Sequence, residues 1–177
     1  MANLEHAVRL RQGSASWNRW RWEFPDVLVD LNNADLSGAN LSRTNLSRTN
    51  LSGANLRESK LNNAILSGAN LSGADLSRAN LSRSDLYGAN LRESNLGRSD
   101  LREADLREAD LSGAWLMEAR MLGANLEQVL MNGANFQGAD LRGIPWLIVM
   151  DLMLQSGANF AGIQWDRPID DAVLLDE

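Results

Sequence analysis

Cysteine is absent from this chain of 177 residues, and histidine occurs once, as His6. Without cysteine there can be no disulfide, no thiolate nucleophile and no cysteine-ligated metal. A lone histidine also leaves the usual nucleophile–base pairs and histidine metal sites incomplete. His6 falls in a predicted N-terminal helix, where we expect it to be solvated or to take part in the end cap. The sequence therefore predicts no enzymatic activity, no metal and no cofactor.

Long apolar runs are missing as well. Crossing a bilayer takes about 18 or more consecutive apolar residues, and the chain has no such stretch. The first residues, MANLEHAVRLRQG, are charged and amphipathic, unlike a secretory signal. We therefore expect a cytoplasmic protein without a membrane partner.

What the chain has instead is a period of five. Every fifth residue from Leu31 to Leu116 is leucine, and a small residue stands two positions earlier in nearly every unit. Helices repeat their apolar positions about every 3.6 residues and strands every 2.0, so a five-residue unit fits neither. A fixed period of this kind predicts a solenoid, in which each unit buries its apolar residues by stacking on its neighbours. The leucine position continues with Met121, Leu126, Met131, Phe136 and Leu141.

The unit A-(D/N)-L-x-x, repeated in one frame, resembles the pentapeptide repeat family over residues 30–165. The resemblance implies an all-β solenoid, a right-handed quadrilateral parallel β-helix with four pentapeptides per coil. The leucine and the small residue two positions before it would point inward, and the other three residues outward. Because coils stack at the strand spacing of about 4.8 Å, about seven coils would form a rod roughly 30 Å long.

Both ends depart from the repeat, as solenoid ends must if they are to cover exposed core and backbone. Residues 1–29 predict an N-terminal cap of short helices, and they resemble the cap found on cyanobacterial members of the family. Within it, Trp17, Trp20 and Phe24 share one helical stripe, and we expect these rings to seal the first coil rather than to bind a partner. Residues 166–177 predict a short C-terminal helix cap.

The repeat fails after Leu141, where residues 144–154 read IPWLIVMDLML, and the frame is irregular over residues 144–157. An extended segment points alternate residues outward, so one narrow coil cannot bury all of these side chains. Outward apolar residues also gather in the preceding coils, and such clusters often mark interfaces. The candidate surface for a partner or for self-association consists of Trp115, Met117, Leu122, Leu130, Trp146 and Leu147.

Two arrangements of this C-terminal third remain open. The surface could pair two copies in a homodimer, as some members of the family pair through their C-terminal ends. Alternatively, residues 144–154 fold back as a plug over their own last coil, with the terminal helix covering Trp115 or Trp146. The second arrangement needs no partner.

Outward charges can be assigned to the four sides by advancing twenty residues at a time. One side has an excess of basic residues, although Asp100, Glu103 and Asp140 interrupt it. It lacks outward aromatic side chains on which bases could stack. We therefore expect a solvated face without strong nucleic-acid binding. This candidate basic face consists of Arg43, Lys60, Arg83, Arg102, Arg120 and Arg142.

Two functions fit the sequence. The first is a non-enzymatic structural or protein-interaction rod, whose protein partner the sequence does not name. The second comes from the resemblance, because some family members mimic double-stranded DNA and inhibit DNA gyrase. A mimic should carry acids along its sides, but residues 30–143 have a net charge of only −2, and residues 144–177 hold −5 of the net −6. The charge distribution favours the first function.

Overall fold

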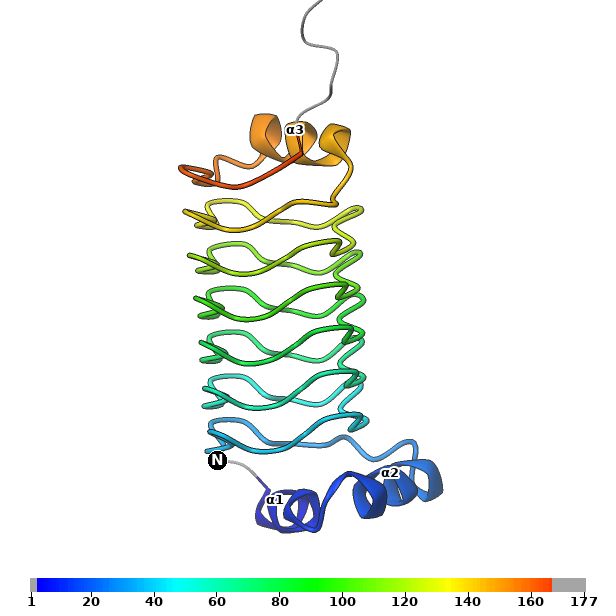
Figure 1. Cartoon of the computed structure of the whole chain (residues 1–177). Helices are drawn as coiled ribbons and strands as arrows, with labels where there is room; N and C mark the ends of the chain where they lie inside the picture. Colours follow the sequence, from blue (N-terminus) through cyan, green and yellow to red (C-terminus); the bar gives the residue numbers. More distant parts are fainter. Residues whose placement is uncertain (1–2, 167–177) are drawn as a thin grey trace, which may run out of the picture.

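The computed structural model describes residues 3–166, which form three helices and a stack of flat coils (Figure 1). Helices α1 (Leu4–Arg11) and α2 (Ser14–Glu23) precede the coils, and α3 (Trp146–Gln155) lies at the opposite end of the stack. None of the helices in the described part of the chain is long and apolar enough to cross a membrane.

Parallel β-bridges hold the coils together. They join each side to the residue twenty positions later, from Asp30 with Asn50 to Arg120 with Asp140, so four five-residue sides make one coil. Within residues 3–166 the β-structure consists of such single bridges and not of longer strands. The reason is local, because every side bends into a turn directly after its central residue.

The backbone of each side is hydrogen-bonded to the neighbouring coils. The Leu51 N–H donates to the Asn70 carbonyl at 2.7 Å, and the Asn70 N–H donates to the Thr49 carbonyl at 2.9 Å. The residue before each leucine supports the turn, since its side-chain oxygen accepts the N–H two residues on, as Asn80 does from Ser82 at 3.0 Å. This contact explains why Asp and Asn are frequent at that position.

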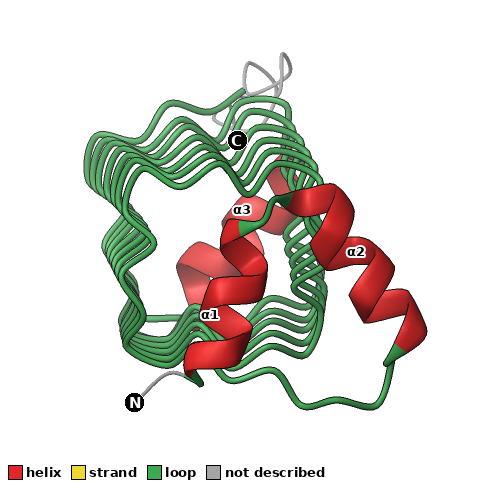
Figure 2. Ribbon diagram, turned by 90° about the horizontal axis from the view of Figure 1, so that it is seen from below, coloured by secondary structure: helices red, strands yellow, loops and turns green. Residues whose placement is uncertain are grey.

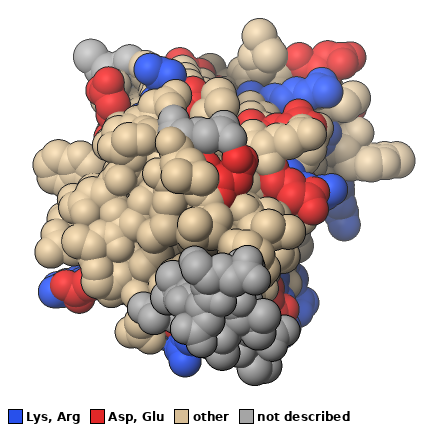
Figure 3. All heavy atoms as spheres, turned by 90° about the horizontal axis from the view of Figure 1, so that it is seen from above, with Lys and Arg blue, Asp and Glu red and all other residues tan. Residues whose placement is uncertain are grey.

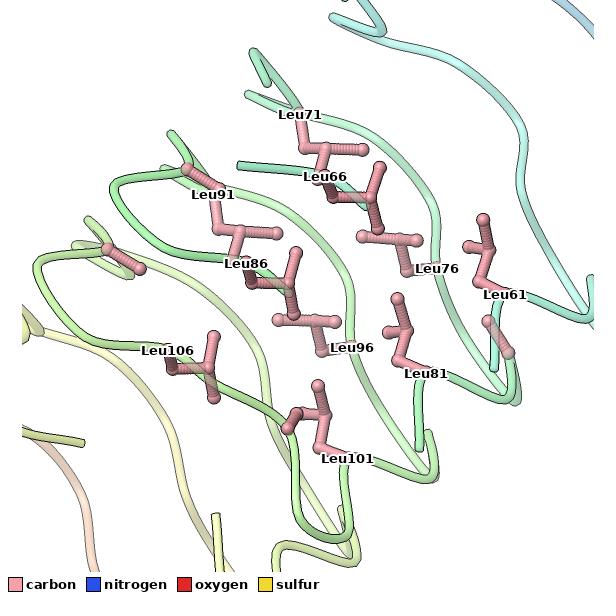
Figure 4. Packing of buried hydrophobic residues seen from close by; sticks show 14 of the residues in the cluster. Leu61, Leu66, Leu71, Leu76, Leu81, Leu86, Leu91, Leu96, Leu101 and Leu106 are labelled. Atoms are coloured by element: carbon pink, nitrogen blue, oxygen red, sulfur yellow. The ribbon is translucent and has the colours of Figure 1, made fainter. Parts of the chain in front are cut away.

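The core is a set of leucine columns that run along the stack. Leu61, Leu81 and Leu101 lie one above another in successive coils, and each is fully buried (Figure 4). The residue two positions before the leucine also points inward and is buried in nearly every unit, as Ala79 is, whereas Ala39 is partly buried. Only one large side chain per side fits inside the tube, which is why the second inward residue is small.

Helix α1 lies across the open end of the first coil, and α2 lies beside it and projects outward past the wall (Figure 2). Trp17 is fully buried, and its indole N–H donates to the Asn45 carbonyl at 2.7 Å. Trp20 is also buried, with its ring centroid 5.1 Å from that of Trp17. These two rings therefore anchor the cap to the coils.

One expectation for the cap needs correction. The spacing predicts that Phe24 shares the sealing stripe, but Phe24 is half exposed, because α2 ends at Glu23 and the backbone turns away at Phe24. Of the two roles expected for His6, the structure shows the one in the cap. His6 is buried, and its Nδ1 accepts the Asp30 N–H at 3.1 Å, which ties α1 to the first coil.

Residues 146–155 form α3 and are not extended, so their side chains do not alternate between inward and outward directions. Pro145 precedes the first helical turn, where a fixed φ and a missing N–H suit a helix start, and no glycine or proline interrupts the apolar run that follows. The helix lies over the end of the stack, in the manner of a plug (Figure 1). The predicted helix over residues 166–177 falls, apart from Asp166, outside the described residues.

The coil resumes after α3 with four extra residues. Asn135 bridges Asn159 and Asp140 bridges Gln164, pairs that lie twenty-four positions apart instead of twenty. Phe160 consequently stacks on Phe136, with ring centroids 5.1 Å apart and planes inclined by 10°. The helix thus replaces part of one coil without ending the stack.

Candidate functional site

Helix α3 carries apolar side chains on both of its faces. Val149 is buried against the last coil at 1% exposure, whereas Leu147 and Leu154 are 65% and 79% exposed and Trp146 is 41% exposed. Seen along the stack from this end, a broad area of the surface shows neither acidic nor basic residues (Figure 3). A helix that is apolar all round is normally buried, so the outer face of α3 is suited to packing against another molecule.

A groove separates α3 from the neighbouring side of the stack. Its volume is about 570 Å³, and Leu130 and Leu147 face it from opposite walls. Glu127 and Asp151 add carboxylates to an otherwise largely apolar lining. The groove residues are Leu126, Glu127, Gln128, Val129, Leu130, Met131, Asn132, Leu147, Ile148, Asp151, Leu152 and Ser156.

The structure brings together only part of the predicted C-terminal surface. Leu130 and Leu147 share the groove, and Trp146 lies at the start of the same helix as Leu147. Trp115 and Met117, both exposed, flank Leu116 on another side of the coil. These residues therefore belong to separate sides of the stack. The sixth residue, Leu122, lies on a third side and approaches Gly143.

Sequence reasoning missed the most exposed apolar residue of this end, Leu154. Leu147 and Leu154 are seven residues apart, which is a helical spacing. That spacing places both side chains on the same outer stripe of a helix. It was the available signal for this part of the surface.

Ion pairs neutralise much of the candidate basic face. Arg43 and Lys60 form no ion pair with any residue of the described segment. The other four members pair with carboxylates of their own face, and such exposed pairs contribute only about 0.2–1 kcal/mol each. The pairs and their N–O distances are Arg83–Glu103 at 3.0 Å, Arg102–Asp100 at 2.6 Å, Arg120–Asp100 at 3.9 Å and Arg142–Asp140 at 2.8 Å.

The same contacts shift the pKa values of the carboxylates on this face. Hydrogen bonds from Arg83, together with its charge, lower the pKa of Glu103. Burial alone would raise the pKa of Asp100, but the hydrogen bonds and charge of Arg102 lower it overall. Arg83, Arg102 and Arg142 thus hold these carboxylates in their charged form, and the three acids offset half of the six basic charges of the face.

The described residues contain no cluster of three or more histidine, cysteine, aspartate or glutamate side chains placed to hold a metal ion. The one histidine is engaged in the N-terminal cap, at the opposite end of the stack from α3. What the C-terminal end offers to another molecule is apolar packing beside a few carboxylates.

A family model described as pentapeptide repeats matches the chain in segments that cover residues 28–63, 49–86, 84–121 and 118–144. These segments coincide with the regular part of the stack. A comparison with curated proteins found no match.

Several solved structures are similar to the chain. A pentapeptide repeat protein from Nostoc is 30% identical, with 86% of this chain and 94% of that one covered and a TM-score of 0.31. One from the Arabidopsis thaliana thylakoid lumen is 29% identical, with coverages of 66% and 67% and a TM-score of 0.38. QnrB1, a plasmid-mediated fluoroquinolone resistance protein, is 20% identical, with coverages of 78% and 84% and a TM-score of 0.41.

Proposed function

The chain belongs to the pentapeptide repeat family, and we propose that it is a non-enzymatic rod that binds another protein through its C-terminal end. The fold is a scaffold, and a function has to be argued from a site on it. The stack supplies a stiff support, and α3 with the adjoining groove supplies the binding surface. The first partner to test is a second copy of the same chain.

One observation carries the proposal, namely the exposure of Leu147 and Leu154 on a helix whose other face is already buried. Val149 and its neighbours attach α3 to the stack, so the outer face is not needed for folding. Solvent-exposed leucines on one stripe, next to a groove of about 570 Å³, are typical of a surface that receives a partner. Along the regular coils the outward positions are mostly polar or charged, and the other strongly exposed apolar residues lie in the N-terminal cap.

The test is the mass of the full-length protein in solution, measured by sedimentation equilibrium up to high micromolar concentration. The variant carries Leu147→Glu together with Leu154→Glu. The control is Leu28→Glu, which places the same charge on a leucine that is 83% exposed at the other end of the rod. A dimer that the double variant abolishes and the control preserves supports the proposal.

Two results would contradict this. A dimer that withstands the double substitution would place the contact elsewhere. If the wild type is a monomer, immobilised wild type, double variant and control can be compared for proteins that they retain from a lysate. Retention that the double variant does not reduce would show that the C-terminal end is not the binding surface.

A further inference from the structure

A second pocket lies at the other end of the molecule, between α2 and one corner of the stack. Its volume is about 540 Å³. It exists because glycines occupy the same corner position in two successive coils. The stem of Arg48 passes over Gly68, with Cγ 3.6 Å from where a Cβ would lie, and nothing is within 4 Å of that point at Gly88. The lining residues are Arg21, Pro25, Asn45, Ser47, Arg48, Ser67, Gly68, Tyr87 and Gly88.

Arg21 is a buried cation in this pocket, 7% exposed. Its guanidinium donates to the Val27 carbonyl at 2.9 Å and to the Ser47 carbonyl at 3.1 Å, and its Nε has no hydrogen-bond partner among the described residues. Both acceptors are neutral, and no carboxylate of the described segment forms an ion pair with Arg21. A buried charge without a counter-charge is unfavourable, so this arrangement calls for an anion.

Arg48 brings a second positive charge to the same place. It follows Ser47 directly and lines the pocket, and it is exposed and forms no ion pair within the described part of the chain. Burial, and after it the charge of Arg48, lowers the pKa of Arg21. Two cations therefore lie close enough to repel each other, although the net charge of the chain is −6.

Two acids beside Tyr87, Glu108 and Asp105, are already engaged. Glu108 is hydrogen-bonded to the Tyr87 hydroxyl, which raises the pKa of that tyrosine. Arg107 lies over the Tyr87 ring, 5.7 Å from its centroid, and pairs with Asp105 at 2.6 Å. The lining itself contains no acidic residue. Tyr87 and Pro25 line the pocket, and no ion pair within the described residues compensates Arg21 or Arg48.

We propose that this pocket binds a small oxyanion, and that a phosphate group is the preferred ligand. Guanidinium groups recognise phosphate and carboxylate oxygens through charge-assisted hydrogen bonds. A phosphate dianion neutralises Arg21 and Arg48 together, whereas one carboxylate neutralises only one of them. The Ser67 hydroxyl supplies a further donor from the wall. This site is independent of the C-terminal surface and of the function proposed for it.

The test is a calorimetric titration of the full-length protein with inorganic phosphate at constant ionic strength. Arg48→Gln is the test variant, because Arg48 is exposed and its loss leaves the cap intact, whereas the buried Arg21 also holds α2 to the coil. Arg43→Gln is the matched control. It removes the same charge from the same corner position of the preceding side, with φ of 58° against 54° at Arg48.

We expect wild type and Arg43→Gln to bind phosphate with similar affinity, and Arg48→Gln to bind it about tenfold more weakly, as the loss of one charge-assisted contact would cause. Equal weakening in both variants would overturn the proposal, because it would reflect overall charge alone. So would wild type that binds no phosphate at tens of millimolar. Acetate that binds as tightly as phosphate would overturn the preference for the phosphate group.

Discussion

At the scale of single residues, the inward leucine is the unit of stability. Leu81 is fully buried between the leucines of the coils before and after it (Figure 4). Leu81→Ala should destabilise the protein by about 2–5 kcal/mol, because the stacked coils on both sides prevent the cavity from collapsing. Ser82→Ala, which changes an outward residue of the same side, should cost under about 0.5 kcal/mol. Denaturation midpoints compare the two, and similar losses would contradict the inward–outward division.

The corners of the coil, where one side turns into the next, provide a second test at this scale. The last residue of each regular unit has a left-handed backbone, with φ of 63° at Gly73 and 74° at Gly143. A Cβ at Gly73 meets nothing within 4 Å, but at Gly143 it lies 3.2 Å from the Gly123 backbone nitrogen. Gly73→Ala should cost about 1 kcal/mol from conformational strain alone.

Gly143→Ala adds a steric conflict with backbone to the same strain, so its loss of stability should be the larger of the two. Thermal unfolding of the two variants under identical conditions checks the order. A Gly143→Ala protein as stable as Gly73→Ala would show that the coils can move apart locally at little cost.

At the scale of elements, α3 behaves as an attached lid on a stack whose units contact only their neighbours. Val149→Asp would bury an unpaired carboxylate, which costs about 3 kcal/mol or more, so α3 should detach while the distant coils stay folded. Leu154→Asp changes an exposed residue and should leave α3 in place.

Amide hydrogen exchange distinguishes these outcomes. In Val149→Asp the amides of α3 should exchange much faster than in the wild type. The amides of residues 61–101 should exchange at the wild-type rate. Fast exchange in both regions would mean that the end helix and the central coils unfold as one unit.

At the scale of the whole molecule, paired carboxylates connect stability with pH. The pKa values of Asp100, Glu103 and Asp140 are lowered in the folded state. A lowered folded-state pKa stabilises the fold above the unfolded value, about 3.9 for Asp and 4.3 for Glu, and this contribution is lost as pH falls through the folded value. The thermal midpoint should therefore be constant from pH 7 to about pH 5. It should decrease once the pH is lowered below about 4.

Asp100→Asn keeps the side-chain oxygen that supports the turn, as Asn80 does in the preceding coil, but removes the titrating group. The thermal midpoint of this variant should decrease less on acidification than that of the wild type. An unchanged acid sensitivity would mean that Asp100 and its two arginines do not contribute to the pH dependence.

The charge of the whole rod also bears on the alternative of DNA mimicry. Duplex DNA carries about one negative charge per 1.7 Å of axis, so a rod roughly 30 Å long would need about eighteen net negative charges to match it. Residues 30–143 have a net charge of −2, and many of their charges are paired. We therefore expect no strong inhibition in a gyrase supercoiling assay with the purified protein. Inhibition at submicromolar concentration would restore the alternative.

Much of the stack could be predicted from the sequence because its information is local and repeated. Five residues specify one side, and the same pattern recurs, so the sequence alone assigns Leu61, Leu81 and Leu101 to one inward column. The predicted stripe of Trp17, Trp20 and Phe24 likewise indicated the two tryptophans that seal the first coil, although Phe24 is half exposed. In each case hydrophobic burial acts on side chains whose spacing along the chain already determines their direction.

Only the tertiary structure decided the features that occur once. Residues 144–154 are apolar on every side, so their pattern could not distinguish an extended segment from α3, and packing on the last coil settled the matter. The neutralisation of the basic face depends on side-chain contacts such as Arg83 with Glu103, across adjacent coils. The pocket of Arg21 and Arg48 depends on where α2 lies against the stack. These are contacts between parts that are distant in sequence, and no local periodicity specifies them.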